Sequence, residues 1–275
     1  MRKSIKPVIK WSGSKSRMAF EIASKIPAHN RYFEPFLGGG SVMYAVLCVL
    51  NPSNVICSDI CEPLINLWEV IKNDPIGLAD YYRKQWERMQ NEGYQVYYEI
   101  RDKFNNSFSA YDLLFLSRTC VNGLIRFNSD SKFNNSLHYS RKGINPDTLR
   151  KIILDWSSRI QTVIFKACDY KEATKEAGEG DFIYLDPPYF NTKGRYYSLS
   201  TIDFDEFFDY LKELNKRGIK WALSFDGKTT NKDYSVKLPE ELFVNHYYLH
   251  AGTSTFKKVM DKQSNTVYES LYTNY

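Results

Sequence analysis

The residues best suited to chemistry in this chain are four consecutive ones: Asp186, Pro187, Pro188 and Tyr189. They follow a short apolar run at residues 182–185, which predicts a buried parallel strand. Ligands of open α/β sheets bind at the carboxyl ends of such strands. Because the two prolines exclude a helix and lack N–H donors, the Asp186 carboxylate and the Pro187 carbonyl remain as rigid acceptors beside an aromatic ring. Such a group suits a planar amine, for example the 6-amino group of adenine.

An amine on an aromatic ring is a poor nucleophile, because its lone pair is delocalised into the ring. In-plane acceptors that hold both amine hydrogens let the nitrogen become pyramidal and attack an electrophile. Positive charge then develops on the nitrogen, and the Asp186 carboxylate with the Pro187 carbonyl would stabilise that charge most in the transition state. We expect Tyr189 to stack on the base. The alternative is a proline-rich turn with a solvated tyrosine.

A glycine turn between a strand and a helix is the second motif. Residues 31–36 predict the strand, residues 38–40 are glycines, and the apolar spacing after them is helical. Glycines let the backbone approach a ligand, and the amino end of a helix presents free N–H groups. Asp59 ends a second strand about 20 residues later, where a Rossmann-type fold places an acid on ribose hydroxyls. The dinucleotide fingerprint is absent, since Met43 occupies the position of its third glycine.

Five segments in this order resemble the Dam-type, or D12 class, DNA adenine methyltransferases. These segments are residues 9–15, the cofactor loop at 33–40, the acid at 58–60, a recognition stretch at 121–128 and the tetrapeptide at 186–189. The recognition stretch is most similar to restriction-associated members such as the EcoRV methylase. The resemblance implies a Rossmann-like α/β fold with an inserted helical target-recognition lobe. It also implies methyl transfer from S-adenosylmethionine to an adenine flipped out of duplex DNA, with S-adenosylhomocysteine as product.

The resemblance further implies a set of site residues. Those for the cofactor are Trp11, Lys15, Glu34, Pro35, Phe36, Gly38, Gly40, Asp59, Ile60, Asp169, Tyr170 and Asp186. Those for catalysis are Asp186, Pro187, Pro188 and Tyr189. Those for DNA recognition are Arg118, Asn122, Gly123, Leu124, Arg126 and Asn128.

Several of these residues have a second interpretation. Asp169 and Tyr170 follow a strand near residues 162–165. Because ligands bind at the carboxyl ends of such strands, which we call the edge rule, we expect both residues at the cleft, in contact with the cofactor's adenine. The alternative is that Asp169 caps a helix and Tyr170 packs in the core. Arg126 has the donors to read guanine and Asn122 those to read adenine, whereas the alternative for Arg118 and Arg126 is an ion pair or a phosphate contact. Residues 13–16 superficially resemble a phosphate loop, but the upstream glycine of a Walker-type site is missing.

Two departures from the family bear on the target. Ser14 occupies a position that is commonly glycine, and residues 133–138 lack the proline that usually follows the recognition stretch. A GATC target is therefore not implied. Two other functions stay open: an amine methyltransferase acting on RNA or on a protein glutamine, and an inactive DNA-binding homologue. The inserted lobe favours DNA, and the intact Asp186 argues against an inactive chain.

The pattern along the chain predicts three parts: residues 1–62 and 160–275 as a catalytic domain, and residues 63–159 as the helical target-recognition domain. Helices are expected at 63–71, 94–105, 111–120 and 146–160, and a loop or short hairpin at 129–145. Later strands are expected at 162–165, 220–224 and 266–272.

Composition agrees with one enzyme of the cytoplasm. The 275 residues are 43% hydrophobic and 16% aromatic, which is enough for a substantial core. The net charge of +5 weakly favours binding to polyanions such as nucleic acids. No membrane span or signal segment is expected. The five cysteines are scattered, which predicts reduced thiols and no requirement for a metal. The expected partners are double-stranded DNA and, acting separately, a cognate restriction endonuclease.

Overall fold

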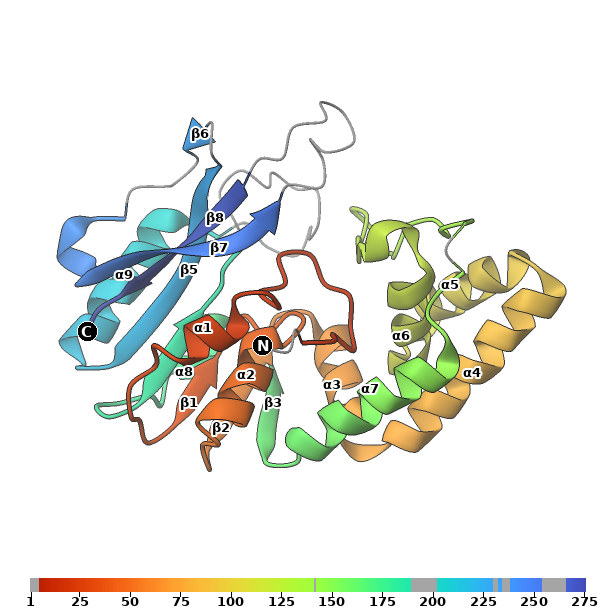
Figure 1. The fold of residues 1–275 in the computed structure, drawn as a ribbon, viewed down its shortest axis with the longest axis horizontal. Helices are drawn as coiled ribbons and strands as arrows, with labels where there is room; N and C mark the ends of the chain where they lie inside the picture. Colours follow the sequence, from red (N-terminus) through yellow and green to blue (C-terminus); the bar gives the residue numbers. More distant parts are fainter. Residues whose placement is uncertain (1–4, 141, 189–201, 230–231, 234–237, 254–265) are drawn as a thin grey trace.

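The computed structural model describes residues 5–140, 142–188, 202–229, 232–233, 238–253 and 266–275. These residues form a twisted sheet with helices on both faces and a helical lobe beside it (Figure 1). The predicted α/β class with an inserted helical segment is confirmed.

The described part of the sheet contains eight strands. In spatial order the main path is β3 (Val163–Ala167), β2 (Val55–Asp59), β1 (Tyr32–Glu34), β4 (Phe182–Leu185), β5 (Lys220–Thr229), β8 (Thr266–Thr273) and β7 (Asn245–Thr253). A short β6 (Lys232–Asp233) pairs with the end of β5. The strands from β3 to β5 are parallel, whereas β8 is antiparallel to both of its neighbours.

The order of the strands creates a switch point between β1 and β4. The chain passes outward from β1 to β2 and β3, and then returns to β4 on the other side of β1. Every residue of β1 and of β4 is buried, as expected of parallel strands that are covered on both faces. Ligands of open α/β sheets bind at such a point, outside the carboxyl ends of the strands.

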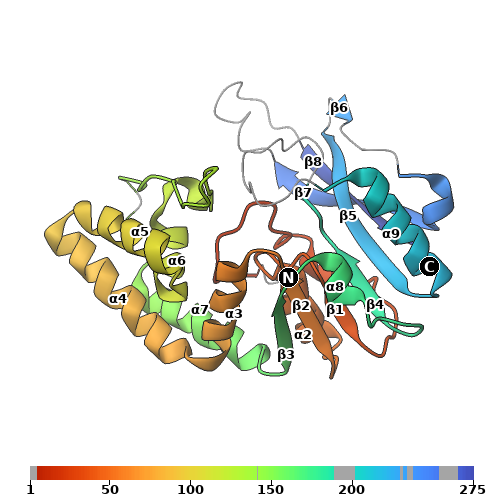
Figure 2. The same cartoon turned by 180° about the vertical axis from the view of Figure 1, so that it is seen from behind.

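Helices cover both faces of the sheet, which Figures 1 and 2 show from opposite sides. One face carries α1 (Ala19–Ala23), α2 (Ser41–Val49) and α3 (Glu62–Asn73), and the other carries α8 (Tyr170–Thr174) and α9 (Phe204–Lys216). The lobe consists of α4 (Pro75–Glu92), α5 (Gln95–Ser107), α6 (Ala110–Thr119), the short η1 (Val121–Gly123) and α7 (Pro146–Arg159). A short η2 (Glu240–Leu242) precedes β7.

Local sequence explains where these helices begin. Asn145 accepts hydrogen bonds from the main-chain N–H groups of Asp147 and Thr148, and Pro146 occupies the first turn of α7. Asp203 caps α9 in the same way, and Asp74 caps α4. Asparagine or aspartate before a helix, with proline just inside it, is a typical start signal.

Most expected elements are confirmed, and β4 has the expected bounds. The sequence pattern did not delimit α4 or β7. The strand β7 lies at the sheet edge and carries mixed polar and aromatic residues, so it lacks the apolar run of a central strand. The described part of residues 129–145 is irregular, and two isolated antiparallel bridges join it to the preceding segment: Phe133 to Phe127 and Leu137 to Cys120.

The expected domain limits fall at the start of α3 and the end of α7. A single cluster of buried side chains nevertheless runs from the sheet face into the lobe, from Val42 through Trp68 to Phe115. The division into residues 1–62, 63–159 and 160–275 stays a prediction.

Candidate active site

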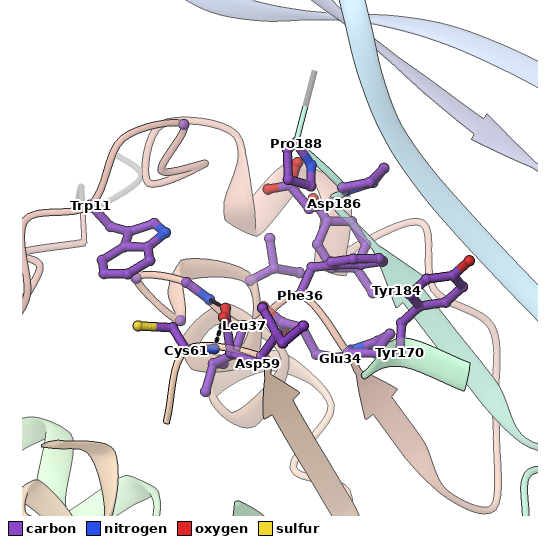
Figure 3. Close-up of a pocket in the computed structure, with 18 of the residues that line it drawn as sticks. Trp11, Glu34, Phe36, Leu37, Asp59, Cys61, Tyr170, Tyr184, Asp186 and Pro188 are labelled. Carbon is purple, nitrogen blue, oxygen red and sulfur yellow. Dashed lines mark hydrogen bonds between the residues drawn. The ribbon is translucent and has the colours of Figure 1, made fainter. Parts of the chain in front are cut away.

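A cavity of about 500 Å³ lies at the switch point between β1 and β4. Residues from five segments line it, 11–15, 34–42, 59–61, 168–170 and 186–188, together with the single residues Leu124, Tyr184, Ile202, Asp203 and Glu206. Figure 3 shows Trp11 on one side of the cavity and Tyr170 on the other, with Asp59 between them and Asp186 above. The fold therefore brings together cofactor and catalytic residues that the sequence analysis selected from distant segments.

The glycine turn is shaped by two tryptophans. Gly38 and Gly40 have positive φ angles of 48° and 64°, and Gly40 precedes α2. A Cβ atom at Gly38 would lie 2.7 Å from the Trp11 ring, and one at Gly40 would lie 2.8 Å from the Trp68 ring. The Trp68 indole N–H donates to the Gly38 carbonyl over 3.1 Å. Glycine is thus required here both for backbone conformation and for the close approach of the rings.

Asp59 holds this turn from the end of β2. Its Oδ2 accepts the Gly38 N–H and its Oδ1 accepts the Cys61 N–H, each over 3.0 Å (Figure 3). Burial raises the pKa of Asp59, and these main-chain N–H groups oppose the shift. The neighbouring Ile60 is 48% exposed and lines the cavity. Asp59 is therefore both a cavity acid and a brace for the glycine turn.

Glu34, Pro35 and Phe36 form the cavity wall at the end of β1. Glu34 is buried, and the Tyr32 hydroxyl donates to its Oε2 over 2.6 Å. Burial raises the pKa of Glu34 to about 8, so the carboxyl group is mostly protonated at neutral pH. The Phe36 ring stacks on Tyr170 with ring centroids 5.3 Å apart.

Asp169 and Tyr170 combine both of their expected interpretations. The Asp169 Oδ1 accepts the Lys171 N–H over 2.8 Å, which caps α8. Tyr170 is buried and packs edge-on against Phe207 as well as on Phe36. Both residues also line the cavity. The cap and the core packing are therefore present, while a contact with a cofactor stays a prediction.

Asp186 extends from the end of β4 and pairs with a buried lysine. The Lys15 Nζ lies 2.8 Å from the Asp186 Oδ1 and also donates to the Gly13 carbonyl over 2.9 Å. Burial raises the pKa of Asp186 to about 6, while Lys15 lowers it and Glu269 raises it further. Pro187 and Pro188 line the cavity beside Asp186, and Tyr189 lies outside the described residues.

Comparison with known proteins agrees with this geometry. A model of the D12 class N6 adenine-specific DNA methyltransferases matches residues 11–261. The chain belongs to this family. It is therefore an adenine-specific DNA methyltransferase, an enzyme that acts on DNA.

Three relatives illustrate the similarity. The type II methyltransferase M.MjaIII of Methanocaldococcus jannaschii is 28% identical over 98% of this chain and 99% of its own length. The type II methyltransferase M1.LlaDCHI of Lactococcus lactis subsp. cremoris is 27% identical over 99% of this chain and 96% of its own. The DNA adenine methylase of Haemophilus influenzae is 31% identical over 67% of this chain and 64% of its own.

The structure changes the interpretation of one residue that we expected to recognise DNA. Arg118 is buried in α6, where its Nε donates to the Val8 carbonyl over 2.9 Å and its Nη2 donates to the Pro7 carbonyl. Its guanidinium therefore ties the lobe of the methyltransferase to the amino-terminal segment. A buried side chain whose donors face main-chain carbonyls is not placed to read a base, so we withdraw Arg118 from the recognition set.

The other recognition residues lie on the segment after α6. Asn122 is exposed at a positive φ of 56°, and Arg126 is exposed with its Nε donating to the Asn134 Oδ1 over 2.9 Å. Leu124 lines the cavity, so this segment reaches the candidate active site. The side-chain oxygen of Asn128 accepts two main-chain N–H groups and shapes the following turn.

Gly123 has a structural requirement of its own. Its φ is 65°, and a Cβ atom there would collide with the side chain of Lys10. The recognition stretch at residues 121–128 thus packs directly on the segment that leads to Trp11.

In the described residues no cluster of three or more histidine, cysteine or acidic side chains could hold a metal ion. No described helix is long and apolar enough to cross a membrane.

Sequence reasoning missed Glu269 of β8, whose Oε2 lies 3.4 Å from the Lys15 Nζ. No local pattern could reveal it, because the contact joins residues at opposite ends of the chain. Glu206, at the amino end of α9, also lines the cavity and was not selected.

Proposed function

We propose that this methyltransferase takes its methyl group from S-adenosylmethionine and transfers it to the 6-amino group of an adenine flipped out of duplex DNA. One observation carries the proposal: Asp186, at the carboxyl end of β4, shares a cavity with the glycine turn and with Asp59. An amine-holding carboxylate and a cofactor site are thus combined in one space of about 500 Å³, a size usual for small-molecule sites.

The chemistry of the lining fits this donor. The described walls carry one lysine, Lys15, and five acids besides the mostly protonated Glu34: Asp59, Asp169, Asp186, Asp203 and Glu206. An acidic wall suits a ligand that carries a sulfonium and an ammonium cation. Ile60, Phe36 and Tyr170 supply apolar surface for its adenine ring, and Asp59 is an acceptor for its ribose hydroxyls. When bound, the donor supplies an electrophilic methyl group.

The chain's own residues prepare the amine of the target. The Asp186 carboxylate and the Pro187 carbonyl each accept one hydrogen of the 6-amino group and turn its lone pair toward the methyl carbon. The nitrogen then forms the N–C bond while the electron pair of the breaking C–S bond goes to sulfur. The cationic nitrogen afterwards gives one proton to Asp186, and water removes it. Stacking on Tyr189 stays the expected way to hold the base.

Target choice is assigned to Asn122 and Arg126, with Gly123, Leu124 and Asn128 shaping the segment that carries them. Two observations support this assignment: the Asn122 and Arg126 side chains are exposed, and Leu124 lines the cavity. A separately acting restriction endonuclease is part of this proposal, and the type II names of two relatives support it. Free thiols at all five cysteines support a reducing compartment, the cytoplasm.

The test is the variant Asp186→Asn, with Asp186→Ala beside it. We expect the rate of methyl transfer to fall by at least about 10²-fold to 10³-fold, while the melting temperature and DNA binding stay close to those of the wild type. The assay measures transfer of tritium from labelled S-adenosylmethionine to unmethylated duplex DNA, RNA or protein extract. Asp209→Asn on the exposed side of α9 is the control, because it makes the same chemical change at a side chain that does not line the cavity. Near-normal turnover of Asp186→Asn, or label in RNA or protein only, contradicts the proposal.

A further inference from the structure

Lys15 is held between two carboxylates that come from different parts of the sheet. Its Nζ lies 2.8 Å from the Asp186 Oδ1 and 3.4 Å from the Glu269 Oε2, and the lysine side chain is 2% exposed. Both acids are also largely shielded, with 19% of the Asp186 side chain and 21% of the Glu269 side chain exposed. In such surroundings charges interact more strongly than they do in water.

The topology explains why Glu269 reaches this place. The strand β8 is antiparallel to β5, and Ser270 lies opposite Phe225, near the carboxyl end of the parallel part of β5. The first half of β8 therefore lies at the same sheet edge as the end of β4, where Asp186 begins its turn. The antiparallel strand β8 thus places a carboxylate from the first half of a strand beside the carboxyl ends of the parallel strands.

The charges of the three residues define their combined effect. A Lys15 cation with the Asp186 anion alone would be a neutral pair, and a neutral pair stabilises a developing cation poorly. With Glu269 the three side chains sum to a net charge of −1. Lys15 is then shared between Asp186 and Glu269 and neutralises Asp186 less. The Asp186 oxygens therefore stabilise the positive charge that develops on the amine more strongly.

We propose that Glu269 is a positioning residue for methyl transfer: it shares Lys15 with Asp186 and keeps the amine-holding group net negative. This inference rests on the proposed function of Asp186. It assigns a role in the reaction to a residue outside every motif found in the sequence.

The charged and titratable groups that face Asp186 allow a specific readout. Among the residues that the structure describes, these groups are Lys15, Glu269, Glu34 and Tyr184. Burial raises the pKa of Asp186 to about 6, Lys15 opposes this, and Glu269 adds to it. Asp186 must be ionised to accept the amine, so activity falls as the pH drops through this pKa. Removing the charge of Glu269 lowers the pKa of Asp186 and moves the acidic limb of the rate to lower pH.

The experiment compares wild type with Glu269→Gln in single-turnover transfer from labelled S-adenosylmethionine to unmethylated duplex DNA, across pH. We expect the plateau rate to fall about tenfold and the acidic limb to move down by about one pH unit, with the KM for DNA and for the donor unchanged. Glu269→Asp, which keeps the charge, should recover most of the rate. Glu21→Gln, a partly buried glutamate on α1, is the control with the same change of net charge.

Coupling to Lys15 gives a second readout. Because Glu269 acts through the lysine, the effect of Glu269→Gln should largely disappear in a Lys15→Gln background. If Glu269→Gln does not fold, Glu269→Thr serves as the neutral variant, since threonine suits a strand.

An unshifted acidic limb, an additive double variant, or a change confined to the KM of the donor would overturn the proposal. Its failure is distinct from failure of the proposed function, because Asp186→Asn would then still lower the rate of transfer by at least about 10²-fold.

Discussion

Glu34 shows how a single buried acid couples this site to pH. The Glu34 carboxyl group is buried at the end of β1, where it accepts a hydrogen bond from the Tyr32 hydroxyl. Burial raises the pKa of Glu34 from 4.5 to about 8. Because the folded state keeps a proton that the unfolded state has lost, the contribution of Glu34 to stability is fully present below pH 4.5. It is lost progressively as the pH rises toward 8.

Glu34→Gln should remove this dependence. We expect the free energy of unfolding of the variant, relative to wild type, to rise between pH 4.5 and pH 8 by up to about 1.4 kcal/mol per pH unit. Urea unfolding at several pH values measures the difference, with Glu21→Gln as the control for a change of net charge. A constant difference across this range would mean that Glu34 titrates near its ordinary pKa.

Individual residues also show what sequence patterns can and cannot reveal. The pattern after each strand identified Asp59, Asp169 and Asp186, because the edge rule needs only strand ends. It also allowed the helix cap that Asp169 makes on α8, but it could not show that Asp59 braces the glycine turn, since that role depends on which N–H groups lie nearby. Arg118 was misjudged for the same reason: a positive charge in a sequence does not disclose whether its partners are phosphates or main-chain carbonyls.

At the scale of elements, the turn between β1 and α2 is the most constrained part of the site. Gly40 combines a φ of 64° with a ring carbon of Trp68 at 2.8 Å from the position of an added Cβ. Gly40→Ala should therefore lower the free energy of unfolding by about 1–3 kcal/mol and weaken binding of S-adenosylmethionine. Thermal unfolding and calorimetric titration measure both effects.

Gly178→Ala is the matched control for this prediction. Gly178 has no atom within 4 Å of an added Cβ and lies in the turn before β4. We expect its stability to stay within about 0.5 kcal/mol of wild type. Equal effects of the two substitutions would contradict the steric argument for Gly40.

The elements that the sequence predicted best are those with one dominant signal. The apolar run of β4 and the capped start of α7 are such cases. The edge strand β7 has no such signal, and its pairing with β8 depends on contacts between segments that are separate in the sequence. The missed acid Glu269 belongs to this same antiparallel part, so the least predictable elements also carried the least predictable site residue.

At the scale of the whole molecule, Arg118 connects the helical lobe to the segment that enters the active site. Arg118→Met keeps much of the buried volume but leaves the Pro7 and Val8 carbonyls without this donor. We expect a loss of about 1–3 kcal/mol in the free energy of unfolding and an unchanged salt dependence of DNA binding. Arg159→Met, a half-exposed arginine on α7, should cost under about 1 kcal/mol. A reduced salt slope for Arg118→Met would instead indicate a phosphate contact.

Arg126 tests whether the lobe and the cavity act together in choosing a target. Its exposed guanidinium is oriented by the bond from Nε to Asn134, on a segment whose Leu124 lines the cavity. If it reads a guanine through two hydrogen bonds, Arg126→Ala should cost about 1–3 kcal/mol at the preferred site and relax selection at one base position.

A phosphate contact would behave differently, because its loss weakens binding to all sequences equally and reduces the slope of log affinity against log salt by about one unit. Lys132→Ala is the control, since Lys132 is exposed in the same loop and we expect it to contact phosphate or water only. Sequencing of methylated sites together with salt titrations distinguishes the two roles. If Arg126→Ala and Lys132→Ala leave the same methylation motif as wild type, Arg126 does not read a base, and the choice of target must come from Asn122 or from residues beyond this segment.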